Sequence, residues 1–256
     1  MTADAEAAVD TLEHVRGMRD EFVDFLSDLC RVESPTDHPG TQSDVHALLA
    51  PAFEDLGYDV RIVPGRVSGN HLLASPRRRR KREPIQLLIG HSDTVWPLET
   101  LERMPVKEVG GRLHGPGTLD MKGGLTLILF ALRALRTLGE GPALAPVVFV
   151  NSDEEVGSPD SKRHVRRLAR SVKRTFVLEP SLGQEGLIKT ARKGVGRFEI
   201  TIRGRAAHAG LDPESGASAI LELSHLIQSL NALNDPARGT TVNVGLVGGG
   251  TRPNVV

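Results

Sequence analysis

The sequence predicts an α/β protein in which a mostly parallel sheet is covered by helices on both faces, followed by a smaller α+β part. Up to residue 190, short and continuously apolar runs alternate with helical patterns. Such runs are typical of parallel strands that are buried on both sides. After residue 190, apolar and polar residues alternate instead, as in strands with one face in water. We therefore expect two domains, residues 1–190 and 191–256.

In the first domain, the spacing of apolar residues sets the expected order of elements. Helical patterns cover residues 15–29, 44–56, 120–139 and 158–172. Strand-like runs cover residues 58–63, 70–75, 84–90, 145–151 and 174–180. The third helical pattern ends in Leu-Gly, a frequent signal for a helix C-terminus. In the second domain we expect an antiparallel sheet from residues 195–205 and 240–250, with an amphipathic helix over residues 215–233.

Composition excludes several classes of protein. Thirty-two basic residues balance thirty-two acidic ones, so the overall charge gives no reason to expect a nucleic acid partner. No run of eighteen apolar residues would span a membrane, and the acidic N-terminus lacks the apolar core of a secretory signal. The single cysteine, Cys30, excludes a disulfide within the chain. We expect a soluble, cytoplasmic protein. The basic run Arg77–Arg82 is interpreted as a solvated loop, with an anion-binding or targeting patch as the alternative.

Three of the predicted strands end in side chains that can bind a metal ion. His91 and Asp93 follow the run "LLIG", Glu154 and Glu155 follow "VVFVNSD", and Glu179 follows "FVL". The carboxyl ends of parallel strands share one edge of a sheet, which is where ligands bind in open α/β folds. The sequence therefore predicts that these imidazole and carboxylate groups meet at that edge.

A further carboxylate, Asp120, lies in the glycine-rich turn "GPGTLDMKGG" that precedes a predicted helix, so it can face the same edge. Converging carboxylates repel each other unless a cation lies between them. A set of His, Asp and Glu ligands is more typical of a catalytic than of a structural zinc. Each motif alone has a simpler explanation: a surface His-Asp pair, charges at a helix start, an N-cap at Asp120, or a Glu-Pro turn. Their combination in this order favours a metal site.

Two further roles follow from the extended backbone. Asp93 lies two residues after His91, so both side chains point to one side, and a carboxylate there can accept the second N–H of a metal-binding imidazole. Neighbouring residues on an extended chain face opposite ways. One of Glu154 and Glu155 can therefore bind metal while the other acts as a general base, a division that suits metal-assisted hydrolysis.

The motifs "GHSDTV", "GPGTLDMKGG", "NSDEEVGS" and "VLEPS" resemble those of a di-zinc peptidase and deacylase family. Its members include glutamate carboxypeptidase, acetylornithine deacetylase, succinyl-diaminopimelate desuccinylase and the aminoacylases. The resemblance is strongest to glutamate carboxypeptidase and runs from about residue 31 to the end of the chain. It implies a zinc exopeptidase-like catalytic domain followed by part of a lid and dimerisation domain.

Carried over residue by residue, the resemblance implies two zinc ions per subunit, with cobalt or manganese as substitutes. His91 and Glu179 would bind one ion, Glu155 would bind the other, and Asp120 would bridge them. Glu154 would deprotonate the bridging water and pass the proton to the leaving amine, while Asp93 would orient His91. The resemblance also implies a cis peptide bond after the bridging aspartate, between Asp120 and Met121.

In the second domain, "RGRAAHAG" resembles the lid motif whose histidine, here His208, reaches across a homodimer to polarise the scissile carbonyl. Without the resemblance, His208 would be interpreted as an ordinary loop histidine. The segment "GGGTRPNVV" resembles one whose asparagine, here Asn254, helps to hold the substrate. Alone, its glycines would indicate a flexible turn.

We therefore expect a zinc-dependent hydrolase, similar to glutamate carboxypeptidase, that cleaves an amide bond to release an amino acid from a peptidyl or N-acyl substrate. The alternatives are an N-acyl amino acid deacylase and a non-catalytic, metal-binding dimerisation module. Relative to the family, the sequence is expected to be C-terminally truncated and to lack a late histidine that completes the Glu155 zinc site. The side-chain specificity is not predicted by any motif in the sequence.

Overall fold

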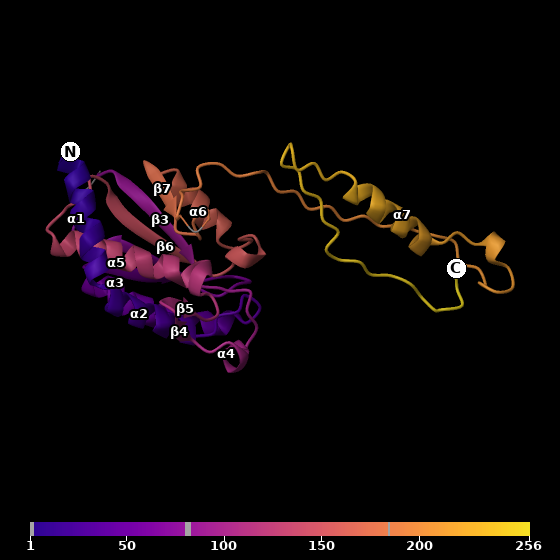
Figure 1. Cartoon of the computed structure of the whole chain (residues 1–256), viewed down its shortest axis with the longest axis horizontal. Helices are drawn as coiled ribbons and strands as arrows, with labels where there is room; N and C mark the ends of the chain where they lie inside the picture. The colour runs from indigo at the N-terminus through magenta and orange to yellow at the C-terminus, as the bar shows by residue number, and fades with distance from the viewer. Residues whose placement is uncertain (1–2, 80–82, 184) are drawn as a thin grey trace. The chain divides into compact units, whose positions relative to one another are not determined.

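The computed structural model describes residues 3–79, 83–183 and 185–256, which form two compact units that divide after Gly186 (Figure 1). The helices of the first unit are α1 (Ala3–Gly17), α2 (Arg19–Arg31), α3 (Gln42–Asp55), α4 (Thr100–Arg103), α5 (Gly123–Thr137) and α6 (Lys162–Ala169). Its strands are β1 (Tyr58–Val63), β2 (His71–Pro76), β3 (Ile85–His91), β4 (Lys107–Val109), β5 (Arg112–His114), β6 (Ala145–Asn151) and β7 (Arg174–Val177). No helix in the described part of the chain is long and apolar enough to cross a membrane.

Five strands form one sheet in the order β1-β2-β6-β3-β7. Strand β3 is parallel to both β6 and β7, whereas β2 is antiparallel to β1 and to β6. Only β2 therefore runs against the common direction of this sheet, and the predicted α/β fold with a mostly parallel sheet is confirmed. The β4-β5 hairpin was not predicted, although its turn residues Gly110 and Gly111 both have the positive φ that a two-residue hairpin turn favours.

Helices cover both faces of the sheet (Figure 1). On one face, Val148 and Val150 of β6 belong to a core built with α2, α3 and α5, and on the other, Val147 and Phe149 pack against Val165 of α6 and its neighbours. Every residue of β6 is buried. Because successive side chains of a strand point to opposite faces, burial on both sides explains the uninterrupted apolar run of this strand.

The predicted helix over residues 120–139 begins later, at Gly123. Asp120 and Met121 have non-helical backbone angles, and the peptide bond between them is cis, as the family resemblance implied. The basic run lies in the connection from β2 to β3, where Arg77 forms an ion pair with Asp59 at 3.2 Å. Residues 80–82 of this run lie outside the described part of the chain.

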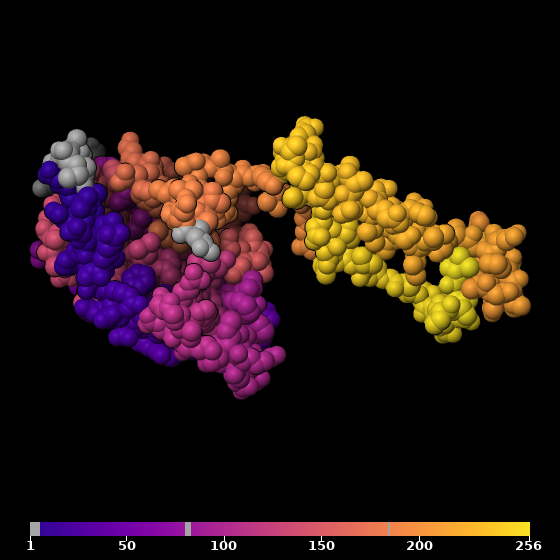
Figure 2. Space-filling view, in the orientation of Figure 1, coloured from indigo at the N-terminus to yellow at the C-terminus, as the bar shows by residue number. Residues whose placement is uncertain are grey.

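The second unit, residues 187–256, contains the helix α7 (Ala219–Asn231), which is capped by the Ser218 hydroxyl accepting the Leu221 N–H at 3.1 Å. The strands predicted over residues 195–205 and 240–250 are wrong, since neither segment is a strand in the structure. Strands require a neighbouring strand for their backbone hydrogen bonds, and in the described residues of this unit only isolated β-bridges occur. Side chains such as Phe198, 89% exposed, are not buried, and Figure 2 shows gaps between the segments of this unit.

Candidate metal centre

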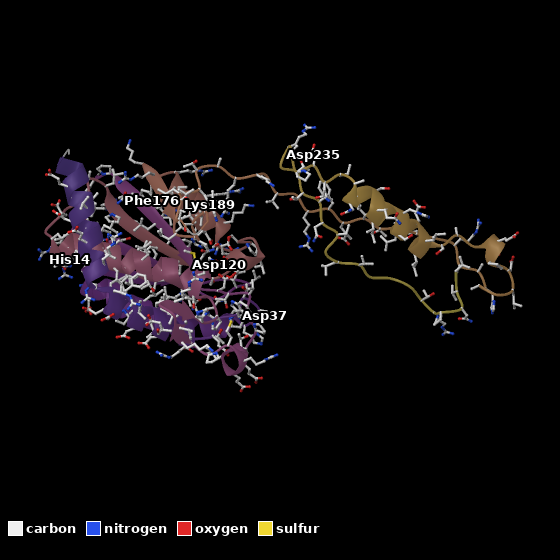
Figure 3. All side chains as sticks on the ribbon, viewed as in Figure 1. His14, Asp37, Asp120, Phe176, Lys189 and Asp235 are labelled. Atoms are coloured by element: carbon white, nitrogen blue, oxygen red, sulfur yellow. The ribbon has the colours of Figure 1, made fainter. Side chains whose placement is uncertain are left out.

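The fold brings the strand ends of the first unit to one edge of the sheet. His91 is the last residue of β3, Glu179 follows β7 by two residues, and the turn Glu154–Val156 follows β6. Because β3 lies between β6 and β7, His91 occupies the middle of this edge. Asp120 precedes α5 and faces the same place (Figure 3).

Three of the predicted ligands form one close group. The His91 Nε2 atom lies 3.1 Å from Asp120 Oδ1 and 3.6 Å from Glu179 Oε1, and the three ligand atoms all lie within 4.8 Å of one another. No other group of three such residues with this spacing occurs in residues 3–79, 83–183 and 185–256. The His91 side chain is buried, whereas that of Asp120 is 54% exposed, so the group is accessible from one side.

The orientation of His91 directs its Nε2 atom toward the carboxylates of Asp120 and Glu179. Its Nδ1 atom donates a hydrogen bond to the backbone carbonyl of Asp93 at 2.8 Å, and the Asp93 carboxylate lies 3.4 Å away. A neutral ring that donates from Nδ1 presents the lone pair of Nε2 to Asp120 and Glu179. A lone pair that faces two carboxylates is repulsive unless a proton or a cation lies between them.

Shifted pKa values agree with this geometry. Burial by itself would lower the pKa of His91, but the hydrogen bond to Asp93 and the negative charges of Asp93 and Glu179 outweigh it and raise the pKa to about 9. Burial, with the charges of Asp120 and Glu154 and despite the opposing charge of His91, raises the pKa of Glu179 to about 7. Both shifts show that the group favours additional positive charge, so its donor set fits a divalent cation.

Asp93 connects His91 to the acidic turn after β6. Its fully buried carboxylate accepts the Thr36 hydroxyl at 2.8 Å and the backbone N–H groups of Glu154 and Glu155 at 3.2 Å each. The predicted proximity of Asp93 to His91 is therefore found, although the shorter contact comes from the Asp93 carbonyl. Glu155 is half-buried and Glu154 is exposed. Burial and the charges of Asp120, Asp93 and Glu154 raise the pKa of Glu155, against the opposing charge of His91. Glu155 therefore interacts electrostatically with the centre, although it is not one of the three residues of the close group.

His208 and Asn254 lie together in the second unit. His208 forms an isolated bridge with Val255, and the Asn254 carbonyl accepts the Ala209 N–H at 3.0 Å. The Nδ1 atom of His208 accepts the N–H of Gly210 at 3.1 Å, so the neutral ring carries its proton on Nε2. The exposed His208 ring is therefore held as a hydrogen-bond donor.

Several known proteins are similar to this chain. Residues 190–256 match the M20 peptidase dimerisation domain. Carboxypeptidase G2 of Pseudomonas sp. (strain RS-16) is 27% identical over 233 residues, covering 90% of this chain and 56% of that protein. Acetylornithine deacetylase of Myxococcus xanthus is 33% identical over 183 residues, covering 66% of this chain and 46% of that protein. This chain is therefore a homologue of carboxypeptidase G2 and acetylornithine deacetylase, and its residues 190–256 form an M20 dimerisation domain.

The M20 homologues are longer than this chain, which spans about half the length of the curated relatives described above. A solved tripeptidase structure from Staphylococcus aureus has a TM-score of 0.65 and 19% identity, with 92% of this chain and 62% of that chain covered. At this identity the similarity concerns the fold alone. The sequence relatives and the matched dimerisation domain, rather than this structure, confirm the resemblance stated from the motifs.

The sequence did not indicate two parts of this candidate centre. Thr36, which holds the Asp93 carboxylate, lies in a loop 57 residues earlier in the chain and belongs to no metal-binding motif. Gly124 lies so close to β7 that a Cβ atom there would be 1.9 Å from the Leu178 carbonyl oxygen. The pair Gly123-Gly124 is visible in the sequence as part of "DMKGG", but which strand it approaches is not.

Proposed function

We propose that this chain contains the di-zinc centre and the dimerisation region of an amidohydrolase that releases an amino acid from a small peptidyl substrate. The observation that carries the proposal is the close group His91, Asp120 and Glu179 at the carboxyl edge of the sheet, joined through Asp93 to Glu154 and Glu155. The names of its homologues support a hydrolase of the carboxypeptidase or deacetylase type.

In this proposal His91 and Glu179 would hold one zinc ion, Glu155 would hold the second, and Asp120 would be a ligand shared by the two. Cobalt or manganese could replace zinc with the same nitrogen and oxygen ligands. When bound, the ions would supply Lewis acidity that polarises the scissile carbonyl and lowers the pKa of the attacking water.

The remaining chemistry is proton transfer and positioning. Asp93 orients the His91 ring and holds the acidic turn by its backbone. Glu154, exposed at the mouth of the centre, accepts a proton from the attacking water and delivers it to the leaving nitrogen. His208 of a second subunit, with its proton on Nε2, donates a hydrogen bond to the developing oxyanion. The dimerisation region at residues 190–256 supports a homodimer.

Glu154→Gln and Asp120→Asn separate catalysis from metal binding. We expect Glu154→Gln to lower the hydrolysis rate by roughly 10²- to 10⁴-fold because it removes the proton acceptor but no ligand. Asp120→Asn should lose zinc, measured by metal analysis after dialysis against a weak chelator. The assay uses the purified chain with zinc and a panel of dipeptides and N-acyl amino acids, with a chelated control.

The outcomes separate the alternatives. Faster hydrolysis of simple N-acyl amino acids than of dipeptides would favour the deacylase. Zinc binding through the three residues, with no hydrolysis of any substrate, would favour the non-catalytic metal-binding module. A wild-type chain that binds no zinc, or a Glu154→Gln variant with the full rate, would contradict the proposal.

A further inference from the structure

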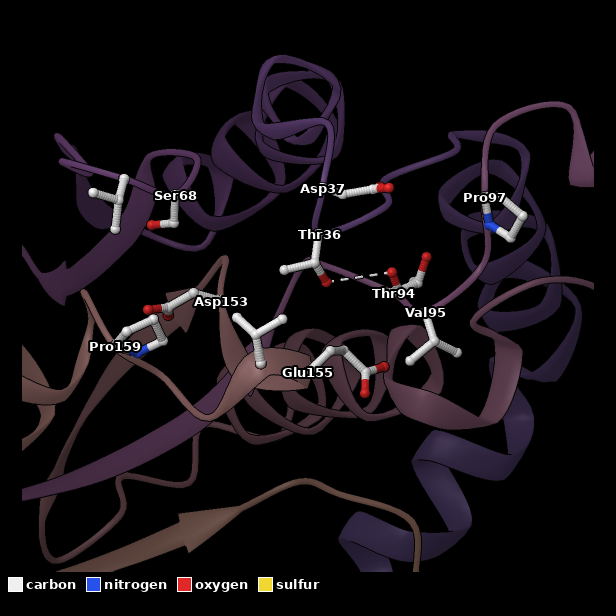
Figure 4. A pocket seen from close by; sticks show the side chains of 11 residues that line it. Thr36, Asp37, Ser68, Thr94, Val95, Pro97, Asp153, Glu155 and Pro159 are labelled. Atoms are coloured by element: carbon white, nitrogen blue, oxygen red, sulfur yellow. Dashed lines mark hydrogen bonds between the residues drawn. The ribbon is translucent and has the colours of Figure 1, made fainter. Parts of the chain in front are cut away.

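A cavity of about 370 Å³ opens beside Glu155 on the first unit (Figure 4). It lies among four loops: the segment after α2, the connection from β1 to β2, the segment after β3 and the loop after β6. Its volume lies near the lower end of the range for small-molecule sites. It therefore fits one side chain or a short acyl group rather than a whole cofactor.

The lining of this cavity is largely apolar, and its charged groups are all acidic. Its apolar side chains are Val67, Val95, Pro97, Val156 and Pro159. Its acidic side chains are Asp37, Asp153 and Glu155. Among the described residues, no lysine, arginine or histidine lines it. A carboxylate that entered would leave water and meet Asp37 and Asp153, which hold no ion in the proposed centre, with no basic side chain in the described lining to balance them.

Hydrogen bonds fix the walls of the cavity before any ligand binds. The buried Asp160 carboxylate accepts the backbone N–H groups of Arg66 and Val67 and the Ser68 hydroxyl, which holds the β1-β2 connection against the loop after β6. On the opposite wall, the Thr36 hydroxyl is bonded to the carboxylate of Asp93 at 2.8 Å. A preformed cavity of this kind costs little ordering entropy on binding.

We propose that this cavity binds an apolar, uncharged substituent of the substrate amide and discriminates against acidic ones. The inference rests on the proposed hydrolase function, because the cavity includes Glu155 of the metal centre in its lining. Aliphatic and aromatic groups gain from burial against the valine and proline side chains. The substituent that enters the cavity lies on either the acyl side or the amine side of the scissile bond. At that position, glutamate and aspartate side chains are disfavoured.

The test uses side chains of similar length and different charge. Zinc-loaded protein is assayed with substrates that carry methionine, glutamine or glutamate, first on the acyl side and then on the amine side of the scissile bond. We expect methionine to exceed glutamate in kcat/KM by about tenfold or more on the side that enters the cavity, with glutamine between them. Equal values, or a preference for glutamate on both sides, would overturn the proposal.

The Val67→Lys variant identifies which side of the scissile bond carries the substituent that enters the cavity. Val67 is 77% exposed at the rim, so lysine can replace it without disturbing the core. The new cation should reduce the preference for methionine over glutamate by about tenfold on one side of the bond only. The matched control is Val109→Lys, since Val109 is 53% exposed on β4 and does not line the cavity. An unchanged ratio on both sides in Val67→Lys would also overturn the proposal.

A binding measurement keeps this proposal separate from the hydrolase proposal. Methyl NMR spectra of the zinc-loaded protein are recorded with N-acetyl-methionine and with N-acetyl-glutamate as probes. Shifts of the Val67, Val95 and Val156 methyl signals with the methionine probe, and weaker ones with glutamate, support the cavity even if no substrate is hydrolysed. Shifts that are absent, or larger with glutamate, overturn it whatever the hydrolysis rates are.

Discussion

Asp160 offers a direct test of how the loops around the centre are held. Its side chain is 4% exposed and accepts hydrogen bonds from the Arg66 N–H, from the Val67 N–H at 3.2 Å and from the Ser68 hydroxyl at 3.2 Å. Asp160→Asn keeps an oxygen acceptor of the same shape and removes only the charge. The variant therefore measures the contribution of the ionised carboxylate to the free energy of unfolding.

The magnitude follows from the pKa of Asp160. Burial alone would raise this pKa, but the hydrogen bonds from Arg66, Val67 and Ser68 outweigh it and lower the pKa to about 2, against 3.8 for an unperturbed aspartate. One pKa unit corresponds to about 1.4 kcal/mol, so the ionised carboxylate stabilises the folded state by about 2 kcal/mol at neutral pH. Because the folded-state pKa is the lower one, this stabilisation is complete above pH 4 and is lost as the pH falls from 4 to 2.

Urea unfolding followed by the fluorescence of Trp96, the single tryptophan, reports on the first unit. The free energy of unfolding of the wild type should exceed that of Asp160→Asn by about 2 kcal/mol at pH 7, and this difference should vanish near pH 2. Asp59→Asn is the control, because Asp59 forms an exposed ion pair with Arg77 and should change the free energy by less than about 1 kcal/mol. A wild-type minus Asp160→Asn difference that stays constant from pH 7 to pH 2 would refute the reasoning.

Two further predictions concern packing and acid sensitivity. Gly124→Ala should force α5 and the Leu178 carbonyl apart, which costs about 1–3 kcal/mol of folding stability and shifts the adjacent Glu179. Zinc affinity, measured by chelator competition, should therefore fall about tenfold or more. The control is Gly141→Ala, which should not change zinc affinity because a Cβ atom at Gly141 would meet no atom within 4 Å. Burial and the neighbouring charge of His71 lower the pKa of His46 to about 4 from 6.5. The free energy of unfolding of the wild type should therefore fall by about 3 kcal/mol between pH 6.5 and pH 4, and that of His46→Gln should not. Equal acid unfolding of the two proteins would contradict the second prediction.

Much of the first unit could be predicted because its elements depend on local patterns. The uninterrupted apolar run of β6 is explained by burial on both faces, and the strand-like runs near it correspond to β1, β2 and β3. The second unit shows the limit of this reasoning. Residues 195–205 and 240–250 alternate as strands do, yet alternation supplies no pairing partner, and pairing is a property of the tertiary structure.

The candidate centre was predictable to the extent that topology determines it. His91 ends β3 and Glu179 follows the parallel neighbour β7, so knowledge of the strand ends is enough to bring them to one edge. The support given by Thr36 depends on where a distant loop folds back, and no spacing in the sequence encodes it. The contact of His91 with the Asp93 carbonyl is a backbone contact, which side-chain motifs do not reveal.

Asp93 explains why the motif after β3 has this composition. A fully buried carboxylate is costly unless its oxygens are bonded, and here the Thr36 hydroxyl and the N–H groups of Glu154 and Glu155 satisfy them. Burial would raise the pKa of Asp93, but the hydrogen bonds and charge of His91 and the Thr36 bond lower it, so the group stays ionised inside the protein. The same anion therefore fixes the ring of His91 and the position of the acidic turn. A displacement of either partner is transmitted to the other through this one side chain, which couples the two halves of the centre.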